Sequence, residues 1–100
     1  MKIDIEPIAE QLIEADEKAA EADISYNKVM QEYEHKKDQF YLRSGMVTGP
    51  LKMAETMENL RQDPIFEKYN DALMRCKITD RRWRTLNTIL IKLRVKNNYE

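Results

Sequence analysis

The sequence is poor in the residues on which catalysis, metal binding and disulfide formation depend. It has one cysteine, Cys76, and one histidine, His35, so an internal disulfide is excluded and neither side chain has a partner of its own kind for a metal site. His35 lies between charged residues on a predicted surface, and Cys76 falls in an apolar seam, where a thiol acts as a small hydrophobic group. The two glycines form no phosphate-binding loop, because residues 44–49 lack the Walker lysine and follow no predicted strand. We therefore expect no enzyme and no catalytic, cofactor or metal site.

Long apolar runs are also missing. No stretch has the length and apolar character of a signal peptide or a membrane span, so we expect no membrane contact and a cytoplasmic protein. With 35% charged residues, two glycines and three prolines, the composition is typical of long helices. One hundred residues predict a single helical domain, residues 1–100, whose small core favours self-association.

Two long segments carry apolar residues at alternating steps of three and four, the heptad spacing of a packed helical seam. The first seam is Ile5, Ile8, Leu12, Ala15, Ala19, Ala22, Tyr26, Val29, Tyr33 and Phe40, interrupted at Lys36. The second is Ile65, Tyr69, Ala72, Cys76, Thr79, Trp83, Leu86, Leu90 and Leu93. The pattern predicts an all-α protein, a long antiparallel helical hairpin with coiled-coil-like seams, and it fits pairing within one chain and between subunits equally well. We expect a homo-oligomer.

Start and stop signals divide the chain into helices at about 6–43, about 50–62 and about 64–97. Ser44-Gly45 predicts the end of the first, with the glycine in the left-handed conformation that closes a helix. Pro50 lies in the predicted first turn of the short connecting helix, and Asp63-Pro64 supplies an N-cap residue and a first-turn proline for the last helix.

The register of the hairpin depends on an assumption. If Phe40 lies near Ile65, then Ala22 lies opposite Trp83, and the other small alanines of the first seam face large leucines of the second. This match of small and large side chains favours a hairpin.

The charges are segregated along the chain. Residues 1–25 hold eight acids and residues 75–96 hold eight bases, although the formal net charge is only −1. At 100° per residue, the bases opposite the second seam are Lys77, Arg81, Arg84 and Lys92, and the acids opposite the first are Glu6, Glu10, Glu14, Glu17 and Glu21. The two outward faces suit either docking of one subunit on the next or binding of phosphates by the bases.

A second basic cluster lies near the predicted helical turn. It consists of Lys36, Lys37, Arg43 and Lys52, interleaved with aromatic residues of which Tyr41 is the best candidate for stacking on a base. Single-stranded nucleic acid is bound by this combination, since aromatic rings stack on bases while lysine and arginine neutralise the backbone. The two clusters together predict a nucleic-acid-binding site.

Three stretches carry a resemblance. They are the segment Lys37-Asp-Gln-Phe-Tyr-Leu-Arg-Ser-Gly45, the step Leu60-Arg-Gln-Asp63-Pro64 with Lys68, and the residues Leu86, Ile89, Leu90, Leu93 and Arg94. Within residues 33–97 their order resembles the UvsY-type recombination mediators of tailed phages. The resemblance implies a non-enzymatic oligomer that binds single-stranded DNA and helps load a RecA-like recombinase onto strands coated by single-strand binding protein. It also implies that Lys37 contacts DNA and that Arg43 ends the contacting segment.

Two other classes of function remain open. The five-glutamate face resembles a nucleic acid in charge, which fits a small phage-like inhibitor or adaptor that binds a host protein through its acidic face. The other class is a structural coiled-coil subunit that binds only itself.

Overall fold

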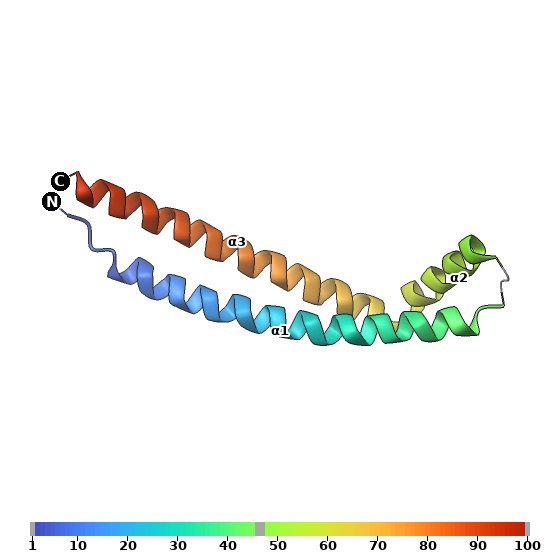
Figure 1. Ribbon diagram of the computed structural model, residues 1–100. Coiled ribbons are helices and arrows are strands. Elements are labelled where there is room, and N and C mark those ends of the chain that lie inside the picture. The colour runs from blue at the N-terminus through green and yellow to red at the C-terminus, as the bar shows by residue number, and fades with distance from the viewer. Residues whose placement is uncertain (1, 46–47, 100) are drawn as a thin grey trace. The chain divides into compact units, whose positions relative to one another are not determined.

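The computed structural model describes residues 2–45 and 48–99, and they form three helices without a strand (Figure 1). Helix α1 spans Glu6–Arg43, α2 spans Gly49–Gln62 and α3 spans Pro64–Asn98. The prediction of an all-α hairpin with a short connecting helix is confirmed. The chain divides into two compact units, which we name the terminal unit (residues up to Asp23 and from Arg75) and the middle unit (Ile24–Met74).

Local hydrogen bonds explain where the helices begin. The Asp4 carboxylate accepts a hydrogen bond from the Glu6 amide at 3.0 Å, and Asp63 accepts one from the Ile65 amide at 2.9 Å. Both carboxylates thus satisfy an amide that the first helical turn leaves without a partner. At α2 the Thr48 carbonyl accepts the amide of Lys52, and the proline falls in the first turn as predicted.

The end of α1 differs from the prediction in one respect. The helix stops at Arg43, but no glycine in the described ranges has a positive φ, so Gly45 does not close it in the left-handed conformation. Instead, the Ser44 amide reaches the Tyr41 carbonyl at 3.3 Å, and the Ser44 hydroxyl donates to Glu55 at 2.6 Å. The Ser44 amide therefore satisfies one of the last carbonyls of α1, and Glu55 on α2 holds the Ser44 side chain.

The core of the middle unit is built by all three helices. Its buried residues are Val29, Leu60, Ile65 and Ala72, and Leu60 of α2 has no exposed surface. Tyr69 packs between two tyrosines of α1, stacked on Tyr33 with ring centroids 4.4 Å apart and tilted against Tyr26 at 5.8 Å. This aromatic packing fixes α3 against α1 near the start of α3.

The terminal unit packs the first part of α1 against the last part of α3. Alanines of α1, Ala15 and Ala22, and leucines of α3, Leu86 and Leu90, are its buried apolar residues. The chain termini are joined through Asn97, whose side chain accepts a hydrogen bond from the Ile3 amide at 2.9 Å and donates one to the Ile3 carbonyl at 2.8 Å. All four residues belong to the two predicted seams, so the seams pack against one another in this unit.

The register differs from the one we assumed. The thiol of Cys76 donates to the Ala22 carbonyl at 3.3 Å, so Ala22 lies against a residue seven positions before Trp83. The reason lies in the middle unit, where α2 folds back along the end of α1 and Asp63 lies 3.9 Å from Lys36. Because α2 packs on the last turns of α1, α3 first meets α1 at residues that lie further from the turn than we assumed.

Candidate nucleic-acid interface

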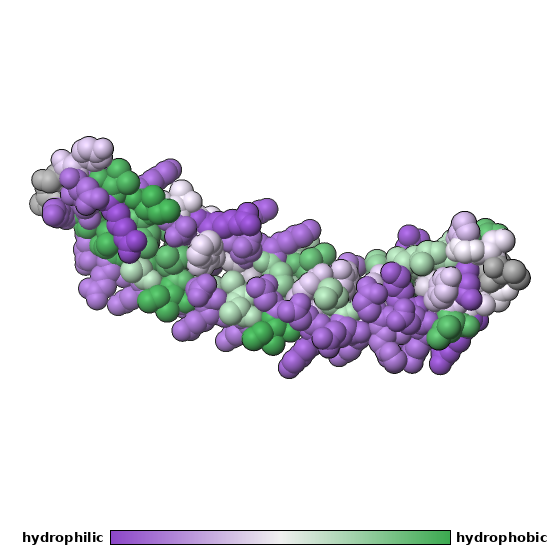
Figure 2. All heavy atoms as spheres, viewed as in Figure 1, coloured by the Kyte–Doolittle hydropathy of each residue, from purple (hydrophilic) through white to green (hydrophobic). Residues whose placement is uncertain are grey.

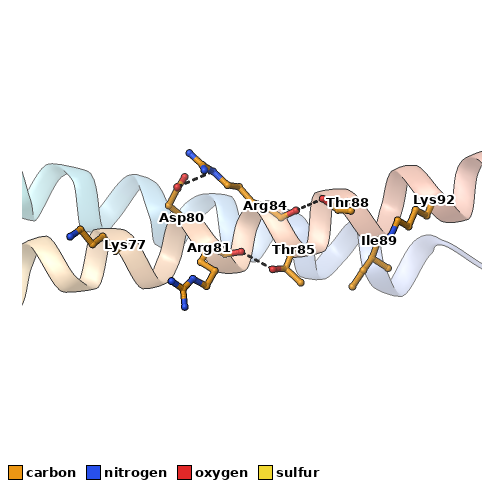
Figure 3. Close-up of a pocket in the computed structure, with 8 residues that line it drawn as sticks. All are labelled: Lys77, Asp80, Arg81, Arg84, Thr85, Thr88, Ile89 and Lys92. Atoms are coloured by element: carbon orange, nitrogen blue, oxygen red, sulfur yellow. Dashed lines mark hydrogen bonds and ion pairs between the residues drawn. The ribbon is translucent and has the colours of Figure 1, made fainter.

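The predicted bases of α3 line one open depression in the terminal unit. We name Lys77, Arg81, Arg84 and Lys92 the basic face; all four are exposed and lie on the side of α3 away from the seam. The depression has a volume of about 590 Å³ and is completed by Asp80, Thr85, Thr88 and Ile89 (Figure 3). The helical periodicity that hides the seam brings these bases together on one surface.

One of the four cations of this surface is paired within the chain. Arg84 Nε lies 3.0 Å from Asp80, while the hydroxyls of Thr85 and Thr88 each donate to a backbone carbonyl one turn earlier, at 2.9 Å. Figure 3 shows Arg84 and Asp80 on one side of the α3 axis and Arg81 on the other. Within the described ranges no ion pair holds Lys77, Arg81 or Lys92.

Four of the lining residues were not predicted as part of the site: the acid Asp80 and the uncharged residues Thr85, Thr88 and Ile89. Thr85, Thr88 and Ile89 follow Arg81 and Arg84 at helical steps of three to five, so the spacing itself could have indicated them. Positive charge was the basis of the predicted site, so the other members of the same face were not included.

The second predicted cluster lies in the middle unit and is partly engaged within the chain. Lys36 is 3.9 Å from Asp63, and the Lys52 ammonium lies 4.6 Å from the centroid of the Tyr41 ring. The cation covers one face of that ring, and the Tyr41 side chain is half-buried. Arg43 is exposed and Lys37 is half-buried, and among residues 2–45 and 48–99 neither takes part in an ion pair.

The remaining candidates have structural surroundings. Burial raises the pKa of the Cys76 thiol, and the neighbouring Asp23 carboxylate raises it further. A thiol held neutral in this way is a poor nucleophile at neutral pH. His35 is exposed and lies 3.1 Å from the side chain of Gln39, one turn away. In residues 2–45 and 48–99 no three histidine, cysteine or carboxylate side chains converge as a metal site would require.

The comparisons with known proteins identify no relative: no family model, no curated protein and no solved structure matches this chain. Across the described residues, none of the helices combines the length and the apolar character that crossing a bilayer requires.

Proposed function

We propose that this chain is a non-enzymatic, oligomeric single-stranded-DNA-binding accessory factor of phage-type homologous recombination, acting in the cytoplasm of a bacterial host and helping to load a RecA-like recombinase. The observation that carries DNA binding is the basic face of α3, on which four exposed cations line one depression. The recombination context rests on the resemblance of residues 33–97 to UvsY-type mediators.

The basic face is as long as a short stretch of phosphate backbone. From Lys77 to Lys92 the helix rises about 22 Å at 1.5 Å per residue. At the spacing of about 3.4 Å that phosphates have along one strand of a duplex, this length corresponds to roughly six phosphates. Four cations over this length can neutralise part of the backbone without reading the bases, which is the behaviour expected of a binder without sequence preference.

The Lys37–Arg43 segment adds a second contact in this proposal. In this proposal Tyr41 stacks on a base, and the neighbouring cations Lys52 and Arg43 supply the charge that holds the backbone nearby. The two clusters lie in different units, so each is proposed as a separate contact with DNA.

The experiment that tests DNA binding measures its salt dependence. For single strands the slope of log K against log salt concentration is about −0.7 for each phosphate neutralised, so four contacts predict about −2.8 from the basic face alone. The double variant Arg81→Ala/Arg84→Ala should make this slope shallower by about 1.4. The matched control is Lys18→Ala/Arg61→Ala, which also removes two surface cations but from outside both clusters. An equal change of slope in the two variants would refute the assignment of the basic face.

A further inference from the structure

The terminal unit has two outward helix faces of opposite charge. The acidic face of α1 comprises Glu6, Glu10, Glu14, Glu17 and Glu21, all exposed, and the basic face of α3 lies on the other helix. The seams of α1 and α3 pack against one another in this unit, so the two faces point in opposite directions. One chain cannot bring its own acidic and basic faces of the terminal unit together, whereas two copies can.

The spacing of the two faces matches when they run antiparallel. Along α3 the positions 77, 81, 84, 88 and 92 of the depression follow one another at steps of 4, 3, 4 and 4, and the glutamates read backwards from 21 to 6 follow the same steps. Both faces therefore span about 22 Å. Aligned in this way, the facing pairs are Lys77 with Glu21, Arg81 with Glu17, Arg84 with Glu14, Thr88 with Glu10 and Lys92 with Glu6.

The contacts that these side chains make within the chain are easily exchanged. Glu14 pairs with Lys18 at 3.0 Å, with side chains 65% and 58% exposed, and Arg84 pairs with Asp80 at 3.0 Å, with side chains 74% and 54% exposed. Ion pairs at such exposure contribute little and give way to a competing partner. They would therefore not prevent the docking of a second copy.

Exposed apolar residues border both faces. Ile78 and Ile89 lie beside the basic face and Ile13 beside the acidic face, and each is at least 39% exposed. Figure 2 shows hydrophobic side chains at the surface of the terminal unit among hydrophilic ones. Burial of such residues at a contact adds a hydrophobic contribution to the electrostatic one.

We propose that the basic face of α3 in one copy binds the acidic face of α1 in a second copy, with the two helices antiparallel. The contact is heterologous, because different surfaces of the two copies meet, and it repeats from copy to copy into a ring or an open row. If single-stranded DNA binds the basic face, as the proposed function holds, DNA and a second copy exclude each other there; this last step alone rests on the proposed function.

The test is a charge exchange followed by sedimentation velocity. Wild-type protein should associate at about 50 mM salt and dissociate at about 500 mM, where screening is strong. Glu14→Arg/Glu17→Arg and Arg81→Glu/Arg84→Glu should each weaken association by at least about tenfold, since each places like charges face to face. The quadruple variant restores opposite charges in the same register and should return to within about threefold of wild type.

A second quadruple variant tests the register. Glu6→Arg/Glu10→Arg combined with Arg81→Glu/Arg84→Glu has the same total charge, but its new arginines face positions 92 and 88, so it should not recover. Far-ultraviolet circular dichroism checks that every variant keeps its helix content. Equal recovery of both quadruple variants, no recovery of either, or double variants that associate like wild type would overturn the proposed contact.

The competition is measured separately with a labelled oligonucleotide of about eight nucleotides, short enough to cover one basic face. Adding it should lower the sedimentation coefficient of associated wild-type protein. Charge-exchange recovery without any oligonucleotide binding would support the contact between copies and refute the proposed function. Oligonucleotide binding at the basic face with charge-insensitive association would refute the contact and leave the proposed function standing.

Discussion

Leu60 offers the sharpest test of how the middle unit is held together. It is the one fully buried leucine among the described residues, and α2 places it against buried residues of α1 and α3. Replacing it with alanine removes three carbons, which at about 0.8 kcal/mol each lowers the free energy of unfolding by about 2.4 kcal/mol. The cavity left behind adds to this loss, so about 3 kcal/mol is expected in all.

A matched substitution exists on the same helix. Leu51 is 58% exposed, so Leu51→Ala should change the free energy of unfolding by no more than about 0.5 kcal/mol. In a thermal melt followed by circular dichroism at 222 nm, the Leu60→Ala midpoint should fall by roughly 12–24 °C, since each kcal/mol is worth about 4–8 °C in a chain of this size. Similar melting of the two variants would show that α2 does not dock through Leu60.

Three further predictions concern the thiol, the termini and the turn. Because burial and Asp23 raise the pKa of Cys76, iodoacetamide should alkylate it more slowly in the folded than in the unfolded chain at neutral pH, and equal alkylation rates would contradict this. The raised pKa also means that the neutral thiol contributes to the free energy of unfolding below the unfolded pKa. This contribution should be lost as the pH rises from the unfolded to the folded pKa of the thiol, because the unfolded chain releases the proton first. Asn97→Ala removes two hydrogen bonds to the Ile3 backbone and should speed amide exchange at Ile3, an effect that Asn98→Ala should not produce. Lys37→Ala/Arg43→Ala should make the salt slope of single-stranded DNA binding shallower by about 1.4, and an unchanged slope and affinity would remove these residues from the site.

The two seams were predictable from the sequence because burial follows helical period. Every residue placed in the seams, from Ile5 to Phe40 and from Ile65 to Leu93, is buried or half-buried, and the interrupting Lys36 is exposed. The same periodicity located the bases of α3 on the outer surface. A repeat of three and four residues determines which side of a helix packs, whatever the axial position of its partner.

The features that the sequence analysis missed depend on tertiary contacts. The heptad period of a seam does not show where along a helix its partner lies. It therefore could not show that α2 covers the end of α1, or that Ala22 pairs with Cys76. Likewise, the partner of Ser44 is Glu55, eleven residues further on, and the partner of Tyr41 is Lys52 on α2. Contacts between helices of this kind arise only once the chain has folded back on itself.

Segregation of charge is the feature that connects fold and proposed function. The formal net charge is −1, yet the terminal unit separates its outward acids from its outward bases on two helices. Such a surface attracts polyanions locally while the whole chain stays close to neutral. Screening by salt should therefore weaken both DNA binding and the contact between copies.

The most direct test of the central claim is the titration of a labelled single-stranded oligonucleotide with the wild-type protein, followed by fluorescence anisotropy at low and at physiological salt, with the mass of the complex measured by light scattering. The account predicts binding with an affinity that falls as salt rises, with a slope of log K against log salt concentration of about −2.8 or steeper. The absence of binding even at low salt would contradict it and would assign the basic face of α3 to contacts between protein surfaces alone.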